Sequence, residues 1–473
     1  MGRQQGFERI SAREQGLKRG LTSGQMSMIA IGGAIGTGLF LGSKFAIGFA
    51  GPSVIISYII GGFITLLLMG CLAEMTVAHS TSGSFGAFAE HYIGPLAGFM
   101  VRYAYWSATV LAVGTEVTAV AQYMKYWFPG VPGWQWVALF SGALVLVNAL
   151  SVKAFGTIEY WFSTIKISAI VAFIILGAYV VWGGPEYGIN HYTAHGGFMP
   201  NGWWGTWIAV IVSIFSYLSV EMIAVAAGEA EDPERAVKSA FRATILRLVI
   251  FYLLTLSLVL AIVPWNTTSQ ATTSPFVTVM ETVGIPGAAG VINFIVLVAA
   301  LSAMNAQLYI TTRMMFSLSR AGYAPAALGR LTASGTPLYA LLLSCGGIAA
   351  AMAVSVLSPE HSFTMMASIS MFGALFTWLM IFVTHYFFRR SRERDRLPPL
   401  SFHMPGFPLL TLLGAALMVA VLVTTYFTEV FRMTLIFGLP FLAVLAGLYF
   451  VMFRKRVAQD AIVSNPSEAD LLP

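Results

Sequence analysis

The sequence predicts an all-α membrane protein, and its composition and the spacing of its apolar segments support that prediction. Of its 473 residues, 57% are hydrophobic and only 10% are charged, whereas a soluble domain is typically about 25% charged. Twelve apolar segments follow one another along the chain, and we expect each to cross the membrane as a helix. Turn-forming residues separate them, as in residues 128–133 and 264–266.

These segments and the polar stretches between them suggest a division of the chain into six parts. The start of the chain is polar and basic and the first apolar run is a full span, so we expect no cleavable signal peptide. The expected parts are a cytoplasmic N-terminal segment (1–21), a first group of five helices (22–182), a second group of five (203–388), a basic cytoplasmic linker (389–406), two further helices (407–453) and a cytoplasmic tail (454–473).

The positions of lysine and arginine predict the orientation of these spans. Most of them fall in segments that share one side of the membrane with the N-terminus, and the loops 183–202 and 266–290 contain neither. Because cytoplasmic loops carry the excess of positive charge, we expect both termini in the cytoplasm and a location in the inner (plasma) membrane. The net charge of +6 therefore reflects the topology of the chain. We expect membrane lipid as a partner and no nucleic acid.

A cluster of glycines interrupts the first apolar run. Four of the seven residues from Gly32 to Gly38 are glycine, the poorest helix former after proline. Backbone groups freed inside a membrane are tolerated only where protein buries them or where they line a cavity. We therefore expect a broken helix here, although close helix packing through Gly-x-x-x-Gly pairs would also explain the glycines.

The sixth apolar segment carries a second interruption, in the sequence Phe215-Ser216-Tyr217-Leu218-Ser219-Val220-Glu221. Interrupted segments at corresponding positions of two halves point to an inverted repeat with a binding site near the midplane.

The two interruptions predict a site for a zwitterion. A half-helix that starts at residues 36–38 offers free N–H groups and a positive dipole end to a carboxylate. Freed carbonyls suit an ammonium group, so the expected ligand is an amino acid. The predicted substrate-binding residues are Ala34, Ile35, Gly36, Thr37, Gly38, Phe215, Ser216, Leu218 and Ser219.

Three ionisable residues lie inside predicted spans, where such groups are costly and usually functional. Lys166 either extends toward the membrane surface or gains and loses a proton. Glu116 is a structural carboxylate, a proton-coupling partner or a group near the substrate. Glu221 either holds the second break open through hydrogen bonds or takes part in gating. Ser302 and Asn305 could face the site or join neighbouring helices.

Four stretches resemble the amino acid–polyamine–organocation superfamily, and its bacterial amino acid transporter branch in particular. They are residues 33–40, 102–106, 227–233 and 313–322, and the resemblance covers about residues 17–455. It implies a LeuT-type fold, with a five-plus-five inverted repeat, broken helices 1 and 6 and two extra C-terminal helices. It also implies proton coupling at Lys166, since proton-coupled members carry lysine there. The chain departs from the family at Ser219, where glycine is usual, and at Lys238, where many relatives have proline.

The predicted function is import of amino acids by proton symport with alternating access. Apolar surroundings favour neutral L-amino acids or γ-aminobutyrate, whereas Glu116 leaves a cationic amino acid permease open. An exchanger on the same fold is the nearest alternative, and an amino acid sensor is less favoured because no output domain is present. The histidines show no metal-ligand spacing and no enzyme motif occurs, so we expect no enzymatic activity, cofactor, metal or obligate protein partner.

Overall fold

The computed structural model is helical throughout its described part, which comprises residues 2–14, 16–17, 21–32, 35–184, 186–230, 232–357 and 362–453. Within these ranges no strand occurs, and an isolated parallel bridge joins Leu21 to Ala230. The tail at 454–473 and predicted site residue Ala34 lie outside the described residues.

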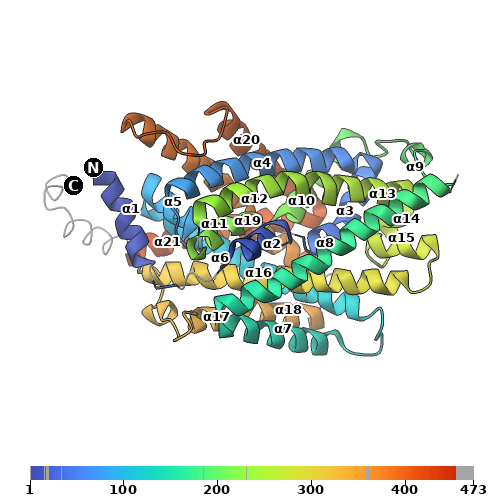
Figure 1. Cartoon of the computed structure of the whole chain (residues 1–473), viewed down its shortest axis with the longest axis horizontal. Helices are drawn as coiled ribbons and strands as arrows, with labels where there is room; N and C mark the ends of the chain where they lie inside the picture. Colours follow the sequence, from blue (N-terminus) through green and yellow to red (C-terminus); the bar gives the residue numbers. More distant parts are fainter. Residues whose placement is uncertain are drawn as a thin grey trace.

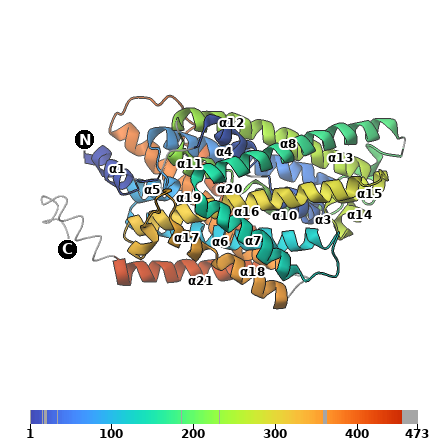
Figure 2. The ribbon, with the colours of Figure 1, turned by 60° about the horizontal axis from the view of Figure 1, so that its bottom comes forward.

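The long helices lie side by side along the longest axis of the molecule (Figure 1). Helices α1 and α5 lie at one end, called the α1 end below, and α9, α14 and α15 lie at the opposite end (Figures 1 and 2). The first part of the chain forms α1 (Gly2–Arg13), α2 (Ser23–Gly32), η1 (Gly38–Gly42), α3 (Ser43–Ala50), η2 (Gly51–Ser53), α4 (Val54–Ala78), α5 (Ser84–Tyr92), α6 (Pro95–Met124), α7 (Gly133–Leu150), α8 (Val152–Gly183) and α9 (Asn190–Thr193).

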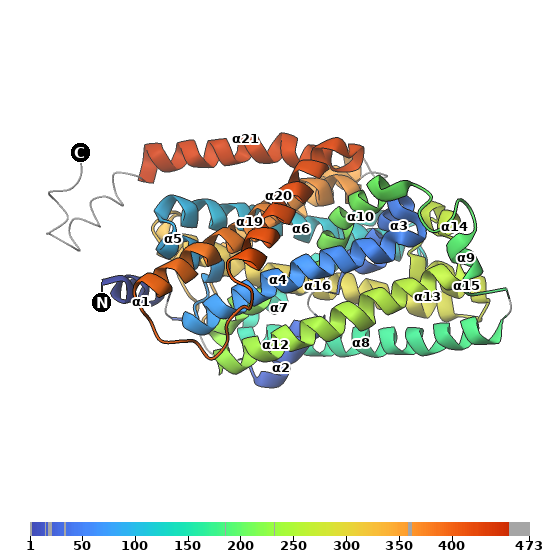
Figure 3. The same ribbon diagram turned by 90° about the horizontal axis from the view of Figure 1, so that it is seen from above.

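The helices of the second part also lie mainly along this axis, and α21 runs along one edge of the molecule (Figure 3). It forms α10 (Gly202–Tyr217), α11 (Met222–Ala226), η3 (Ala227–Glu229), α12 (Pro233–Arg247), η4 (Leu248–Leu254), α13 (Thr255–Ile262), α14 (Trp265–Gln270), α15 (Pro275–Val283), α16 (Ala288–Arg320), η5 (Ala326–Gly329), α17 (Leu338–Ser344), α18 (Gly346–Leu357), α19 (Ser362–Arg394), α20 (Leu409–Phe427), η6 (Glu429–Phe431), α21 (Arg432–Leu448) and η7 (Tyr449–Phe453).

Nine helical stretches in the described residues are long and apolar enough to cross a membrane. Two shorter apolar stretches, Ile250–Ile262 and Leu338–Val354, accompany them. The sequence predicts twelve spans. The difference arises partly because Gly38–Ala78 is one continuous stretch of 41 residues. It contains two predicted segments, which meet at Gly51, a glycine with a φ of +63° next to Pro52.

Burial separates an inner set of helices from an outer set. The most apolar part of Gly202–Glu229 is 83% buried inside the protein, whereas that of Glu429–Phe453 is 17% buried. A helix that is apolar on exposed faces suits a lipid environment rather than water. Among the inner helices, α16 and α19 both pack against α6, and α10 packs against α3, α4 and η1.

The two interruptions lie in backbone contact. The first run has α2 ending at Gly32 and the π-helix η1 beginning at Gly38, and the second has α10 ending at Tyr217 and α11 beginning at Met222. A Cβ atom placed on Gly38 would lie 2.6 Å from the Cα atom of Ser216. This contact brings residues far apart in sequence to one place, and it positions the site.

Candidate functional site

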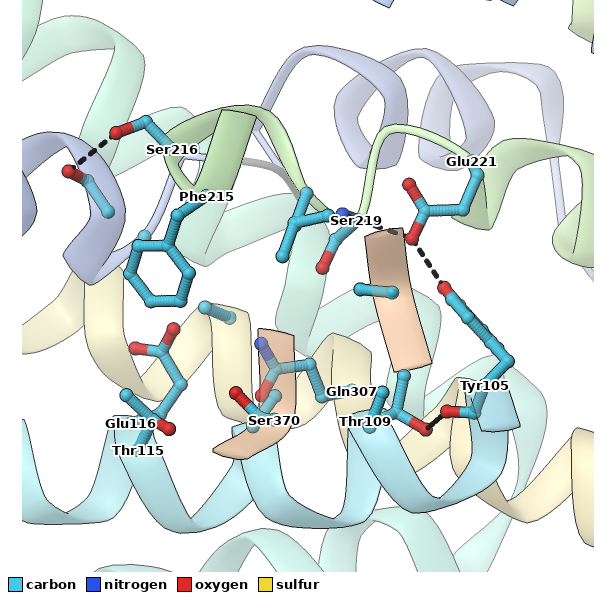
Figure 4. A pocket seen from close by; sticks show the side chains of 17 residues that line it. Tyr105, Thr109, Thr115, Glu116, Phe215, Ser216, Ser219, Glu221, Gln307 and Ser370 are labelled. Atoms are coloured by element: carbon cyan, nitrogen blue, oxygen red, sulfur yellow. Dashed lines mark hydrogen bonds between the residues drawn. The ribbon is translucent and has the colours of Figure 1, made fainter. Parts of the chain in front are cut away.

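A buried cavity lies between the two interrupted segments and the helices α6, α16 and α19 (Figure 4). Its lining mixes small apolar side chains with hydroxyl, amide and carboxyl groups. The lining residues are Gly36, Gly38, Tyr105, Ala108, Thr109, Ala112, Thr115, Glu116, Phe215, Ser216, Leu218, Ser219, Glu221, Ala303, Gln307, Ser370 and Ala374.

The glycines of the first interruption permit close approach of two other helices. A Cβ atom on Gly36 would lie 2.8 Å from the Cβ atom of Ala303 and 3.3 Å from Oε1 of Glu116. One on Gly38 would meet the backbone of Ser216. Real Cβ atoms do not come so close to backbone, so packing alone requires glycine at position 38.

Ser216 joins the two interruptions through hydrogen bonds. Its Oγ atom donates to the carbonyl oxygen of Gly38 at 2.7 Å. Its own carbonyl oxygen accepts the Tyr252 hydroxyl at 2.8 Å, which leaves one lone pair of this oxygen for another donor. The Ser216 carbonyl therefore has a structural hydrogen bond, whereas the sequence indicated only a role in binding the substrate.

Glu221 is tied to the second interruption. Its Oε1 atom accepts the Tyr105 hydroxyl at 2.6 Å and the backbone N–H of Ser219 at 3.3 Å. Its Oε2 atom accepts the indole N–H of Trp378 at 3.1 Å. Figure 4 shows Glu221 beside the non-helical turn, with Tyr105 reaching it from α6. This arrangement fits the first of the two roles considered for Glu221, holding the turn open.

Ser219 has a backbone conformation that glycine adopts readily. Its φ angle is +74°, in the left-handed region, where an L side chain costs roughly 1–2 kcal/mol. The side chain is half-buried and lines the cavity. The strain gives a physical reason why glycine suits this position, and the serine adds a hydroxyl group to the cavity wall.

Glu116 reaches the first interruption from α6. Its Oε1 atom accepts the Thr37 hydroxyl at 3.0 Å, and the residue is 4% exposed. Its Oε2 atom has no hydrogen-bond partner among the described residues, and neither has Oε1 of Gln307 on α16. In Figure 4 the Glu116 carboxylate projects toward the Phe215 ring. Two buried oxygens of the cavity are thus available to a hydrogen-bond donor.

Lys166 lies on the other side of the same interruption. The residue is fully buried, and its Nζ atom donates to the carbonyl oxygen of Ile35 at 3.0 Å and to Oγ of Ser302 at 2.7 Å. One alternative from the sequence was that Lys166 extends to the membrane surface. That alternative is wrong, because the side chain is buried. It also lies 4.0 Å from Oε1 of Glu159.

Several residues of this site were missed by sequence reasoning. Glu159 is fully buried on α8, and the rule that singled out Lys166, an ionisable group inside an apolar span, would have found it too. Tyr105, Gln307 and Ser370 carried no such signal, because uncharged polar residues are common in membrane helices and only the packing shows which of them face the cavity. Among the described residues, no group of three His, Cys, Asp or Glu side chains could hold a metal ion.

A buried ion pair joins the end of the sixth apolar segment to α16. Glu229 accepts two hydrogen bonds from Arg313, at 2.8 and 3.1 Å, and one from the Tyr309 hydroxyl at 2.6 Å. The backbone N–H of Leu21 donates to the carbonyl oxygen of Glu229 at 3.4 Å. Leu21 is thereby joined to Glu229, whose side chain in turn binds Arg313 of α16.

A second cluster surrounds Arg102. Its guanidinium group donates to Oε2 of Glu90 at 2.7 Å and to Oγ of Ser317 at 2.9 Å, and it lies 3.5 Å from Oε1 of Glu14. Burial alone would raise the pKa of Glu90, but Arg102 and Arg13 beside it hold that pKa below its ordinary value. The four sequence stretches that carry the family resemblance therefore meet around the cavity and at its α1 side.

Comparisons with known proteins identify the family of this chain. The family model described as "Amino acid permease" matches residues 25–462. The chain belongs to the amino acid permease family. Its similar relatives include an uncharacterized amino acid permease, YtnA, of Bacillus subtilis, which is 37% identical over 97% of this chain and 100% of that relative.

Two further relatives of this permease carry more specific names. The gamma-aminobutyric acid permease of Bacillus subtilis is 36% identical over 97% of this chain and 99% of its own length. The aromatic amino acid transport protein AroP of Escherichia coli is 37% identical over 85% of this chain and 90% of its own length. Together with the apolar helices, these matches identify a multi-pass membrane protein and support amino acid transport as its activity.

Proposed function

We propose that this permease imports an amino acid together with a proton by alternating access. The proposal depends on two buried ionisable residues that hydrogen-bond to the same helix break. Lys166 donates to the Ile35 carbonyl, and Glu116 accepts from the Thr37 hydroxyl. The cavity begins at this break. A change of protonation at either residue would therefore alter the wall of the binding site itself.

The substrate's α-carboxylate docks at residues 36–38, where the half-helix η1 starts and the first N–H groups of a helix lack intrahelical partners. Its ammonium group faces carbonyl oxygens of the second break, at Phe215, Ser216 and Leu218. The side chain extends between α6, α16 and α19, where Ala108, Ala303 and Ala374 leave room.

Proton coupling supplies the driving force for uptake. Co-transport of one proton with a zwitterion moves one net positive charge inward, and the membrane potential then contributes about 2.3 kcal/mol per 100 mV. Lys166 and Glu116 are the proposed proton-coupling residues, and Glu221 stabilises the turn that gates the site through Tyr105 and Trp378.

The proposed substrate class is neutral L-amino acids or γ-aminobutyrate, because the space beside the two breaks is bordered by small apolar side chains such as Ala108, Ala303 and Ala374. A second candidate is a cationic amino acid. The Oε2 atom of Glu116 favours it, because a buried carboxylate oxygen without a hydrogen-bond partner among the described residues can bind a substrate's cationic group.

The proposed architecture has twelve spans in the inner membrane, both termini in the cytoplasm and two inverted repeats of five helices each. Interrupted helices at positions one and six are typical of this arrangement. Transport then consists of rocking one group of helices against the other, so that the cavity opens first away from the α1 end and then toward it.

Uptake by the purified permease in proteoliposomes tests this function directly. A panel of labelled amino acids is offered under an inward proton gradient, an inward sodium gradient or neither. We expect uptake of one chemical class under the proton gradient alone. Sodium-driven uptake that is indifferent to pH would defeat proton symport, and uptake that needs internal amino acid but no ion gradient would identify an exchanger.

A further inference from the structure

A buried carboxylate lies close to Lys166, the buried lysine of α8 that contacts the first helix break. Glu159 and Lys166 lie on α8, seven residues and thus about two helical turns apart, so they share one face of the helix. Both side chains are 0% exposed, and Nζ of Lys166 lies 4.0 Å from Oε1 of Glu159. Burying one charge alone costs several kcal/mol, whereas an ion pair offsets much of that cost.

The hydrogen bonds around Glu159 are those of an ionised carboxylate. Its Oε1 atom accepts the hydroxyl of Ser302 at 2.5 Å and that of Ser163 at 3.4 Å, and its Oε2 atom accepts the amide of Asn305 at 3.1 Å. The amide of Asn148 on α7 donates in turn to Oδ1 of Asn305 at 2.9 Å, which orients the Asn305 amide group toward Glu159. Both carboxylate oxygens accept from hydroxyl or amide donors, an arrangement that suits an ionised carboxylate.

Ser302 connects the two charges. Its Oγ atom accepts a hydrogen bond from Nζ of Lys166 at 2.7 Å and donates its own proton to Glu159. Nζ of Lys166 also donates to the carbonyl oxygen of Ile35, in the first helix break. The ammonium group is therefore held between a fixed carboxylate on its own helix and the backbone at the cavity.

We propose that Glu159 is the counter-ion of Lys166 and sets the pH range in which Lys166 holds its proton during transport. The proposal rests on the proposed function for its transport readout. When Nζ gives up a proton to the solvent, Lys166 becomes neutral and Glu159 stays behind as an unpaired buried charge. Glu159 thus opposes proton loss, and it acts as a positioning residue through Lys166.

Other charged groups near the pair are already engaged elsewhere. The helices α2, α7 and α13 pack against α8 and carry no titratable side chain. Of the titratable residues on α16, Tyr309 and Arg313 bind Glu229, and Arg320 lies at the far end of the helix over the Phe316 ring. Glu116 faces the pair from α6 across the break. Glu159 is the carboxylate within 4.0 Å of Lys166 in the described part of the chain.

The test is the pH dependence of uptake in the full-length permease carrying Glu159→Gln. Glutamine keeps the shape and can still accept from Ser302, but it removes the charge, so Lys166 loses its proton more readily. An opposite charge at this range shifts a pKa by about 1–3 units. We therefore expect the external pH for half-maximal uptake to move toward acid by about one unit or more.

Two variants separate charge from structure. Glu159→Asp keeps the charge and should keep the pH midpoint even if the rate falls. Ser163→Ala removes a hydrogen bond from Glu159 without changing any charge, and it should leave the midpoint in place. An unchanged midpoint in Glu159→Gln, or an equal shift in Ser163→Ala, would overturn the proposal.

A stability measurement covers the case in which the single variants fold poorly or uptake lacks pH dependence. Lys166→Ala leaves Glu159 unpaired, so adding Glu159→Gln should raise the thermal midpoint of the detergent-purified protein above that of Lys166→Ala alone. Additive losses in the double variant would contradict the ion pair. A wild-type profile that is flat with pH would contradict proton symport, while this cycle would still decide whether the two residues form a pair.

Discussion

Gly38 lies where the backbones of two interrupted helices touch, and Gly42 lies one turn further along the same π-helix. A Cβ atom on Gly38 would approach the Cα atom of Ser216 to 2.6 Å, whereas one on Gly42 would have its nearest neighbour at an ordinary 3.6 Å. Because backbone cannot move aside as a side chain can, we expect Gly38→Ala to cost about 2 kcal/mol of stability.

Uptake by Gly38→Ala should fall at least about tenfold, since the same shift would widen the cavity and displace the start of η1. Gly42→Ala is the matched control and should retain near-normal uptake and thermal stability. Both are measured in proteoliposomes and by thermal unfolding in detergent. Equal behaviour of the two variants would show that the close contact has no functional weight.

A substitution of Ser219 should raise the stability of the protein, whereas Gly38→Ala should lower it. Because its φ of +74° is unfavourable for any residue with a side chain, Ser219→Gly should raise stability by about 1 kcal/mol. It should also change the substrate preference, since a hydroxyl leaves the cavity wall. Ser370→Gly, in the helical part of α19 on the same cavity, should instead lower stability by about 1 kcal/mol. A loss of stability in Ser219→Gly would show that the serine hydroxyl contributes more than the strain costs.

Helix α1 is held to the body of the molecule by buried contacts rather than lying free. Phe7 and Ile10 are buried. Glu14, just after the helix, accepts the backbone N–H of Gly83 at 2.7 Å and the hydroxyl of Ser317 at 2.5 Å. These contacts dock α1 and Glu14 against the rest of the molecule at the α1 end.

Removal of the Glu14 carboxylate should weaken the docking of α1 against the rest of the molecule. Glu14→Ala leaves donors on the loop before α5 and on α16 unpaired, at a cost of about 1–3 kcal/mol. We expect faster proteolysis within residues 1–21 in the purified protein and a larger share of molecules open at the α1 end. The exposed Glu8 on α1 provides the control, because Glu8→Ala removes a carboxylate from the same helix without a buried contact. Equal protection in both variants would mean that α1 docks through its apolar side chains alone.

His79, at the C-terminal end of α4, should make this docking sensitive to acid. Its ring stacks on the ring of Phe7, with the two ring centroids 4.0 Å apart. Burial, aided by His91 and Arg392, lowers the pKa of His79 from 6.5 to about 4. A freed His79 binds a proton below pH 6.5 but the docked one does not, so docking weakens as pH falls from 6.5 toward 4. Protease sensitivity of α1 should rise over that range in the wild type and stay flat in His79→Phe. A flat wild-type profile would contradict this role of His79.

At the scale of the whole molecule, the membrane character and the two interruptions could be predicted because each depends on local composition. A run of glycines at 32–38 and two serines with a carboxylate at 216–221 conflict with an apolar helix wherever the chain folds. Their contact through Gly38 and Ser216 could not be predicted, because it depends on how α10 crosses η1.

Pairings between distant residues were equally out of reach of the sequence. Arg313 and Glu229 belong to two recognisable motifs, yet neither motif indicates that the two side chains form an ion pair. The same holds for Glu14 with Arg102. Partners of this kind are set by helix packing, so sequence patterns identify the ionisable residue but not the residue that neutralises it.

Charge movement during uptake tests the central account most directly. Proteoliposomes with an acidic exterior are supplied with the transported amino acid, and inward current and labelled uptake are recorded together for the wild type and Lys166→Ala. We predict an inward current in the wild type that grows as the exterior becomes more acidic, and loss of this proton dependence in Lys166→Ala. Electroneutral uptake, or an unchanged proton dependence in Lys166→Ala, would contradict proton coupling through the buried lysine.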